Sequence, residues 1–305
     1  MRTRFCETIF WGKGFAKPRL LFWRGFRISS ARRRGLGRNA GGSGRYRKIL
    51  KKCYNFIMFL EVKNLRFAFW DNKGKQILKD ISFSLEKGKT LVIVGSSGSG
   101  KSTILRLISG ILPEKDDLFS GQILVNNENP NKFLEKGKLS FMFQQPALFP
   151  NYSVKENIEI PLKIKNEKED VKNIIDTVGL TQYQNYLPKQ LSGGMKTRVA
   201  LARSFVTKPE LLLLDEPFSA LDIAWKDALY HELKQLVNSF NTTVVLVTHD
   251  IEEALKLGDK IICLGIDGDI IFKKSNANEQ NLFSLLEEKI IENHKLRKNE
   301  YEKIS

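Results

Sequence analysis

The chain has 305 residues, and its 50 Lys and Arg against 34 Asp and Glu give a formal net charge of +16. Residues 1–57 contain eleven Arg and five Lys but one acid, Glu7, so the rest of the chain is almost neutral. This distribution removes most of the argument for a nucleic-acid-binding face on the folded part of the protein.

The cysteine pattern and the lengths of the apolar runs exclude further classes. Cys6, Cys53 and Cys263 form no C-x-x-C pair, which argues against a disulfide framework or a cysteine metal site and favours a reducing compartment. No apolar run approaches the roughly 20 residues that span a bilayer. If this protein acts at a membrane, another chain must supply the span.

Residues 1–57 show no helical or strand periodicity, and Gly-Gly-Ser-Gly interrupts them at 41–44. They lack the continuous apolar region of a secretory signal. The acid-poor composition fits an organelle transit peptide, but serines are few. We favour a disordered leader, or sequence upstream of the true start, and expect ordered structure to begin at Met58.

The next segments predict strands. Apolar residues alternate from Leu60 to Phe69, as in a half-buried strand, and a second strand is expected at 77–85. The apolar, β-branched run at 90–94 is typical of a buried parallel strand. A further short strand is expected at 121–125.

A glycine-rich loop follows the 90–94 strand and fits the pattern G-x-x-x-x-G-K-[ST]. The loop comprises Gly95, Ser96, Ser97, Gly98, Ser99, Gly100, Lys101, Ser102 and Thr103. In such a loop backbone N–H groups cradle phosphates, Lys101 reaches the β/γ-phosphates and the Ser102 hydroxyl ligates Mg²⁺. Apolar residues then recur at helical spacing, at Ile104, Leu107, Ile108 and Ile111. The strand–loop–helix context therefore predicts a nucleotide site.

The middle of the chain changes to helical patterns. A strand ends at 141–146 in a polar, proline-broken loop, and Ser153 with Glu156 has the spacing of a capping box. A second helical stripe ends at Gly179. We expect the interval from about 146 to 190 to be a mostly helical subdomain inserted into an α/β chain.

The α/β pattern resumes at Leu191-Ser-Gly-Gly-Met195, where the glycine pair opens a helix with Ser192 near its N-cap. An apolar strand at 211–214, a helix from Trp225 to Leu236 and a strand at 243–247 follow. The polar tail at the end of the chain is expected to form one helix.

Two acids follow the 211–214 strand directly. Because consecutive strand residues point to opposite sides, Asp215 and Glu216 can take different roles. Asp215 suits Mg²⁺, directly or through water, and Glu216 suits the polarising of an attacking water. Solvated surface charge is the alternative interpretation. His249 ends the next predicted strand, at the same edge of the sheet, where open α/β sheets bind ligands.

Taken in order, these motifs resemble the ATP-binding subunit of an ABC transporter. The matching positions are Phe69, the loop at 95–103, Gln144, Leu191 to Met195, Asp215-Glu216, Ser219 to Asp222 and His249. The resemblance covers about residues 59–275. It implies an α/β fold with a P-loop NTPase core of the ABC ATPase type, a small antiparallel β subdomain and an inserted helical subdomain. The expected organisation is a leader at 1–57, the ATPase domain at 58–275 and the tail at 276–305.

The resemblance also implies roles for single residues. ATP and Mg²⁺ would be the cofactors, with Phe69 stacking on adenine and Ser102, Gln144 and Asp215 serving Mg²⁺. Glu216 would be the general base and His249 would contact the γ-phosphate. Gln144 would also link Mg²⁺ or the attacking water to the transport subunit.

The resemblance implies partners as well. Two ATPase subunits would pair head to tail, each ATP lying between the P-loop of one and Ser192, Gly193 and Gly194 of the other, with Asp222 at the interface. Permease subunits would supply the membrane spans, with the ATPase on the cytoplasmic face of the cell membrane and an external solute-binding protein in an importer. The face near 144–152 would meet the permease.

Two positions depart from the common signature: Met195 stands where Gln is usual, and Thr197 where Gln is common. Met195 and Glu216 to Asp222 resemble the subgroup that serves importers of nitrate, sulfonates and taurine, so import of a small anion or similar solute is expected. Two alternatives stay open: an exporter ATPase, and a soluble ABC ATPase acting on nucleic acid or the ribosome. The short interval between P-loop and signature has no sustained heptads and there is one P-loop, which favours the transporter.

A chain that starts at Met58 is expected to fold and to hydrolyse ATP like the full-length protein, because no expected site residue lies upstream. Melting temperature and ATPase rate of the two chains test this. A clear drop in melting temperature on deletion would show that residues 1–57 contain packed structure. N-terminal sequencing of native protein would reveal a processed targeting peptide.

Overall fold

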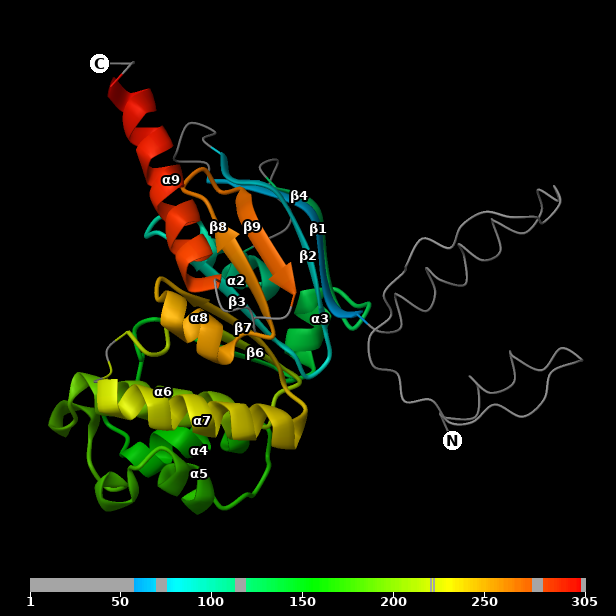
Figure 1. Ribbon diagram of the computed structural model, residues 1–305. Coiled ribbons are helices and arrows are strands. Elements are labelled where there is room, and N and C mark those ends of the chain that lie inside the picture. The colour runs from blue at the N-terminus through cyan, green and yellow to red at the C-terminus, as the bar shows by residue number, and fades with distance from the viewer. Residues whose placement is uncertain are drawn as a thin grey trace, which may run out of the picture. The chain divides into compact units, whose positions relative to one another are not determined.

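The computed structural model describes residues 58–69, 76–112, 119–219, 221, 223–275 and 282–302. The leader at 1–57 and the expected interface residue Asp222 lie outside the described residues. The described part contains two sheets and the helices that pack on them (Figure 1).

A three-stranded antiparallel sheet has the order β2-β1-β4. Its strands are β1 (Met58–Ala68), β2 (Gln76–Glu86) and β4 (Phe119–Val125). Along β1 the apolar spacing slips from two to three between Val62 and Leu65, and the pairing with β2 shifts register there. Asn64, with a φ of 49°, takes up the extra residue, so Val62 and Leu65 are both buried.

The second sheet has six strands in the order β5-β6-β7-β3-β8-β9. They are β3 (Thr90–Gly95), β5 (Leu139–Met142), β6 (Leu211–Asp215), β7 (Thr243–Thr248), β8 (Lys260–Leu264) and β9 (Ile270–Ser275). All neighbouring pairs are parallel except β8 with β9. The strand predictions at 90–94, 211–214 and 243–247 are confirmed, whereas β8 and β9 were not anticipated from the sequence.

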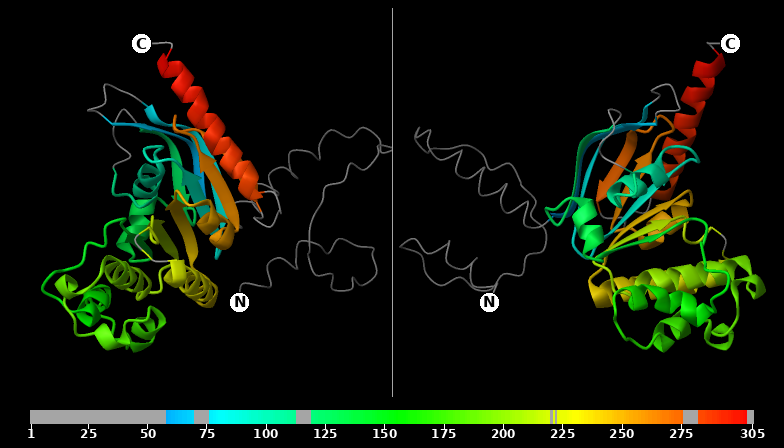
Figure 2. Two further views of the ribbon diagram at one scale, coloured as in Figure 1. Left: turned by 60° about the vertical axis from the view of Figure 1, so that its left-hand side comes forward. Right: turned by 180° about the vertical axis from the view of Figure 1, so that it is seen from behind.

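Helices make up most of the remainder. They are α2 (Lys101–Ile108), α3 (Pro130–Glu135), α4 (Val154–Ile164), α5 (Lys172–Thr177), α6 (Gly193–Phe205), α7 (Ile223–Phe240), α8 (Ile251–Leu257) and α9 (Leu282–Glu302), with 3₁₀ turns η2 (Thr181–Tyr183) and η3 (Pro188–Gln190). The predicted capping box at Ser153 and Glu156 opens α4. The tail helix α9 packs against α8 and β9 (Figure 2). Its Leu286 is fully buried and belongs to the same apolar cluster as residues of α8 and β9.

One helix boundary differs from the expectation. The helix after the glycine-rich loop ends at Ile108, and Ile111 lies beyond it with 47% of its surface exposed. Gly110, at a φ of 74°, turns the chain out of the helix. The apolar spacing continued past the point where the backbone left the helical conformation.

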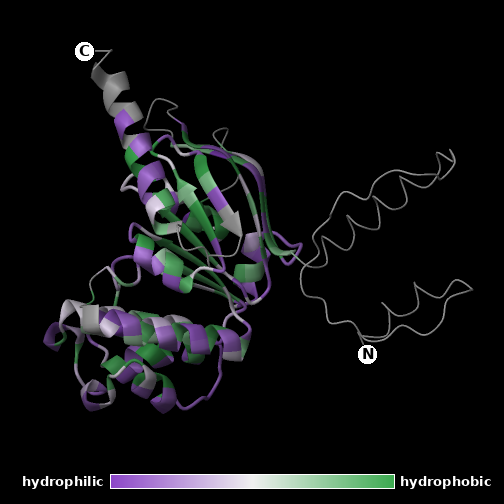
Figure 3. Ribbon diagram, in the orientation of Figure 1, coloured by the Kyte–Doolittle hydropathy of each residue, from purple (hydrophilic) through white to green (hydrophobic). Residues whose placement is uncertain are grey.

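The six-stranded sheet is buried on both faces because its strands alternate between two apolar clusters. Val92, Leu212 and Leu246 belong to the cluster that includes residues of α4 to α9. Leu91, Leu213 and Val245 belong to the cluster that includes α2 and the antiparallel sheet. Figure 3 shows the result as strongly hydrophobic strands at the centre of the fold. Alternation with period two explains how one apolar run fills both clusters.

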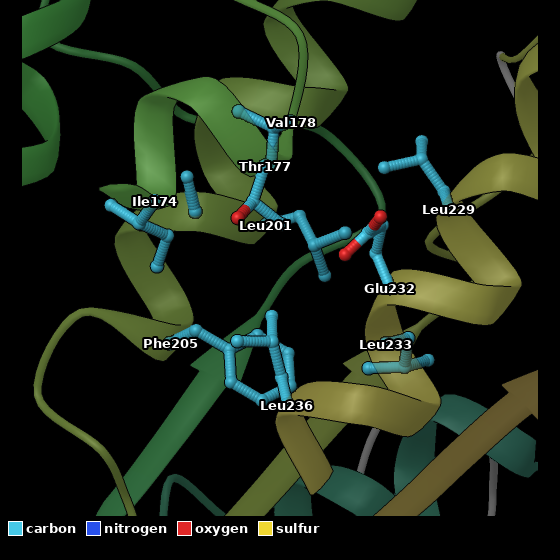
Figure 4. A pocket seen from close by; sticks show the side chains of 10 residues that line it. Ile174, Thr177, Val178, Leu201, Phe205, Leu229, Glu232, Leu233 and Leu236 are labelled. Carbon is cyan, nitrogen blue, oxygen red and sulfur yellow. The ribbon is translucent and has the colours of Figure 1, made fainter. Parts of the chain in front are cut away.

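Helices α5, α6 and α7 pack together around a small apolar crevice. Figure 4 looks into it, where Leu201 and Phe205 of α6 and Leu229 and Leu236 of α7 face Ile174 of α5. Beside this crevice the buried Arg198 places its guanidinium 4.1 Å from the centre of the Trp225 ring and donates to Val178 O at 3.0 Å. These contacts tie the inserted helices to the helix that begins at the signature residues.

Asn157 is a fully buried polar residue that the sequence patterns did not reveal. Its Nδ2 lies 3.2, 2.8 and 3.0 Å from the carbonyl oxygens of Phe149, Tyr152 and Ser153, and its Oδ1 accepts from Phe149 N at 2.9 Å. The side chain therefore fastens the 149–153 loop onto α4. Buried amides are retained when each polar atom has a partner.

Asn157→Ala should lower the free energy of unfolding by about 3 kcal/mol, because it removes these bonds and strips backbone groups of their partner. Urea denaturation measures the loss. Asn173→Ala, at an exposed position on α5, is the matched control and should change stability little. Equal effects of the two substitutions would contradict the role given to Asn157.

Candidate functional site

The candidate site lies at the edge of the six-stranded sheet where β5, β6, β7 and β3 end. Parallel pairing places Asp215 opposite Val247 and Thr248 opposite Val94, so the carboxyl ends of these adjacent strands are level. The residues just past those ends are Gln144, Glu216, His249 and the glycine-rich loop. The strand order therefore gathers predicted site residues that are up to 154 positions apart in the numbering.

The glycine-rich loop connects β3 to α2 and depends on its glycines. Gly98 and Gly100 have φ values of 80° and 95°, in the left-handed region that favours glycine. A Cβ on Gly100 would lie 2.8 Å from Leu78 Cδ2, and one on Gly95 would lie 2.5 Å from Leu264 O. The loop is thus pressed against β2 and β8, and the first N–H groups of α2 are free to bind an anion.

Lys101 is buried at the start of α2. Its Nζ donates to Gly95 O and Ser96 O, both at 2.8 Å, so the ammonium sits within the loop. Burial lowers the pKa of Lys101, while the nearby carboxylates of Glu216 and Asp215 raise it. The side chain thus forms a desolvated positive centre in the loop that is expected to hold phosphates.

Asp215 lies at the end of β6 and is 2% exposed. The Ser102 hydroxyl donates to its Oδ1 at 2.8 Å. Burial raises the pKa of Asp215, and the hydrogen bond from Ser102 opposes that rise. A hydroxyl and a carboxylate in contact form the hard-oxygen donor pair that Mg²⁺ prefers, so the residues present fit this ion.

Two residues that the sequence predicts for the site lie against one oxygen of Glu216. Gln144 Nε2 donates to Glu216 Oε2 at 3.0 Å, and His249 Nδ1 lies 3.4 Å from the same atom. Glu216 has a φ of 46°, a left-handed conformation unusual for this residue, and its N–H donates to Val247 O at 3.0 Å. The backbone therefore leaves the strand sharply, and the carboxylate is directed differently from that of Asp215.

Phe69, the residue expected to stack on adenine, follows β1 and is half-buried. Its ring makes an edge-on contact with Phe67, with centroids 4.9 Å apart. The two rings form an aromatic surface beside β1.

The signature residues begin α6. Ser192 is the N-cap and its hydroxyl accepts from Met195 N at 3.2 Å, while Ser192 and Gly193 are exposed. A Cβ on Gly193 would meet nothing within 4 Å. The helix α6 packs on α4, α5 and β5, whereas α2 packs on β3, β6 and β7. The strand ends thus gather the P-loop, Gln144, Asp215, Glu216 and His249 at one edge, whereas the signature opens α6, which packs on β5 and on the inserted helices α4 and α5.

Motif reasoning missed the residues on either side of His249. Thr248 is buried, and Asp250 is the N-cap of α8, its side chain accepting from Glu252 N and Glu253 N. Asp250 with acids at the second and third positions after it, Glu252 and Glu253, was a visible capping signal. The buried position of Glu253 had no such signal.

Comparison with known proteins agrees with this geometry. The protein-family model described as ABC transporter matches residues 78–219. An aliphatic sulfonates import ATP-binding protein, SsuB, from Bacillus anthracis is 37% identical over 224 residues, which cover 72% of this chain and 87% of that protein.

Solved structures agree too. The dimeric ATP-binding cassette MJ0796, in a post-hydrolysis state bound to ADP and Pi, matches with a TM-score of 0.63 at 30% identity, covering 71% of this chain and 98% of that one. An ATP binding subunit of an ABC transporter shares the fold at a TM-score of 0.65 and 22% identity, covering 77% and 99% of the two chains. The expected fold class is confirmed, and the chain belongs to the family of ABC transporter ATP-binding proteins, which are ATPases.

Proposed function

We propose that this ATPase hydrolyses ATP at the edge formed by β5, β6, β7 and β3, with Glu216 as the general base. The contact of Glu216 with both Gln144 and His249, next to the P-loop, is the observation that carries the proposal. The water oxygen attacks the γ-phosphorus and its proton passes to the Glu216 carboxylate. The bond between the γ-phosphorus and the bridging oxygen of ADP then breaks.

Each neighbouring residue has a part in this reaction. Lys101 neutralises charge on the β/γ-phosphates as the bond breaks, and His249 hydrogen-bonds the γ-phosphate. Ser102 and Asp215, joined at 2.8 Å, would hold Mg²⁺ together with Gln144, and the ion would supply charge neutralisation at the phosphates. Phe69 offers the aromatic surface for the adenine ring.

We propose further that two ATPase subunits complete each other's sites. Ser192, Gly193 and Gly194 open α6 as an anion-seeking helix terminus, and Ser192 and Gly193 are exposed. A second subunit placed head to tail would bring its signature over the P-loop, with Asp222 at the interface. The MJ0796 cassettes are dimeric, which supports this arrangement.

A groove of about 330 Å³ supports docking of a permease. It is lined by Phe141, Met142, Phe143, Pro146, Phe149, Ile160, Ile164 and Arg203, among others. The exposed fractions of Phe143, Phe149 and Ile164 are 42%, 46% and 77%. Exposed apolar side chains that gather in one patch mark an interaction site. The groove adjoins Gln144, so a helix seated there would sense the state of Glu216. Tyr152, paired edge-on with Phe149, extends the apolar rim.

The similarity to the importer subgroup supports a solute class and a location for this subunit. The similarity to a sulfonate import ATPase and the Met195 signature support import of a small anion through separate permease subunits, with an external solute-binding protein. Among the described helices none is both long and apolar enough to cross a bilayer. The similarity to an import ATP-binding protein supports a position at the cytoplasmic face of the cell membrane, bound to the permease. Identification of the membrane proteins that co-purify would separate an importer from an exporter.

Lys101→Ala should abolish ATP hydrolysis, because it removes the cation that neutralises phosphate charge in the transition state. A phosphate-release assay measures the loss, and circular dichroism checks that the fold is intact. Lys132→Ala, on the exposed face of α3, is the control and should leave turnover unchanged. Wild-type turnover in the folded Lys101 variant would refute the P-loop assignment.

Glu216→Gln should bind ATP but not hydrolyse it, because the amide keeps the size of the side chain and lacks its basicity. The ATP-bound head-to-tail dimer should then accumulate, which gel filtration with ATP and Mg²⁺ detects. Normal hydrolysis by this variant would remove Glu216 from the role of base. A strictly monomeric variant with bound ATP would count against the shared site.

A further inference from the structure

A charged cluster between α7 and α8 lies directly behind His249 and has no part in the reaction described above. Its centre is Glu253, whose side chain is 2% exposed. Lys226 of α7 contacts Glu253 Oε1 at 3.0 Å and Asp250 Oδ2 at 3.2 Å. A buried carboxylate is tolerated when a cation and hydrogen bonds balance it, and Lys226 supplies the cation.

The cluster holds the chain on both sides of His249. Thr248 Oγ1 donates to Glu253 Oε2 at 2.7 Å and accepts from Asp250 N at 3.0 Å. Asp250 Oδ1 accepts from the first N–H groups of α8 at 2.9 and 3.3 Å, which leaves its Oδ2 to Lys226. The residues before and after His249 are therefore tied to the ion pair between the half-buried Lys226 and the buried Glu253.

His249 itself has fewer anchors. Its side chain is 57% exposed and lies 3.4 Å from Glu216 Oε2. An exposed ring on a loop takes its position from the backbone that carries it, and that backbone is held at Thr248 and Asp250. Lys226 lies in the first turns of α7, and its contacts with Asp250 and Glu253 connect this helix to the loop of His249.

We propose that Lys226 is a positioning residue for ATP hydrolysis: by pairing with Glu253 and Asp250 it holds the 248–250 turn so that the His249 ring faces Glu216. The proposal rests on the roles proposed above for Glu216 and His249. The contacts of Lys226 are with Asp250 and Glu253 and not with the P-loop residues Lys101 and Ser102, so its loss should lower turnover much more than ATP binding.

The same pair of helices offers a matched control. Lys256 of α8 also bridges α7 and α8, contacting Asp227 at 2.6 Å and Glu252 at 2.8 Å, but its side chain is 40% exposed and its partners are 66% and 65% exposed. Lys256→Met removes the same charge from the same interface without touching the 248–250 turn. Exposed ion pairs of this kind contribute little.

The experiment compares full-length Lys226→Met, Lys226→Arg, Lys256→Met and the double variant Lys226→Met with Glu253→Gln. Lys226→Met should lower kcat about tenfold or more with KM for ATP within about twofold of wild type, because the turn shifts and the P-loop does not. Lys226→Arg keeps the charge and should recover turnover to within about threefold. Lys256→Met should match wild type.

The double variant keeps the test decisive if Lys226→Met does not fold. It removes the buried carboxylate together with its cation, so it should melt near wild type. It still lacks the tie to Asp250, so kcat should stay about threefold or more below wild type with KM unchanged. Wild-type kcat in a folded Lys226→Met or double variant, or an equal loss in Lys256→Met, would overturn the proposal.

A spectroscopic measurement separates this proposal from the one it rests on. The chain has three histidines, so imidazole NMR signals of the labelled protein can be assigned with His249→Gln. The His249 signal should shift in Lys226→Met and stay in place in Lys256→Met; an unmoved signal in Lys226→Met would overturn the positioning role. Normal turnover in His249→Gln would instead refute the role of His249, whatever the NMR signal does.

Discussion

The parallel pairing of β5, β6, β7 and β3 in that order is the constraint on which the site depends. Each of these strands is too short and too apolar to carry chemistry along its length, so functional side chains appear where the strands end. Level registers place those ends on a single edge, and Gln144, Asp215, Glu216, His249 and the P-loop meet there. A slip of one residue in β6 would exchange the faces of its leucines and move Asp215 off the edge.

Burying charged side chains at that edge of the sheet costs free energy of desolvation. Lys101 and Asp215 are both buried, and burial disfavours the charged form of each, which the opposite shifts of their pKa values express. Neither side chain lacks partners: Lys101 has two loop carbonyls and Asp215 has the Ser102 hydroxyl. The polar edge is supported from behind by two apolar clusters that fill both faces of the sheet. Rigid packing below the edge allows strained backbone, such as the left-handed Glu216, to persist at it.

The helical side of the molecule is attached to this core through polar contacts as well as apolar ones. Asn157 binds the loop that carries Phe149 and Tyr152, Arg203 donates to Ala147 O and Pro146 O, and Arg198 joins α6 to the end of α5. These bonds fix the walls of the groove beside Gln144. A partner seated in the groove would therefore act on a surface that is continuous with the sheet edge that carries Glu216.

Local pattern in the sequence determined the elements whose signals are local: the P-loop with its flanking strand and helix, the capping box at Ser153, the N-cap at Ser192 and the apolar strands that end at Asp215 and before His249. Each of these signals lies within a few residues, because strand alternation, helix capping and phosphate loops are set by neighbours in the chain. Sequence patterns gave a wrong or missing prediction where the tertiary structure sets the element. The helix α2 ends before Ile111, at the turn that contains Gly110, and β8 and β9 are held in the sheet by the pairing of β8 with β3 and of β9 with β8. Only the tertiary structure brought Gln144 and His249 to the same oxygen of Glu216, and only it buried Asn157 and Glu253. Burial of a polar group depends on the packing of the whole fold and on the partners that the fold supplies, so no local sequence pattern indicates it.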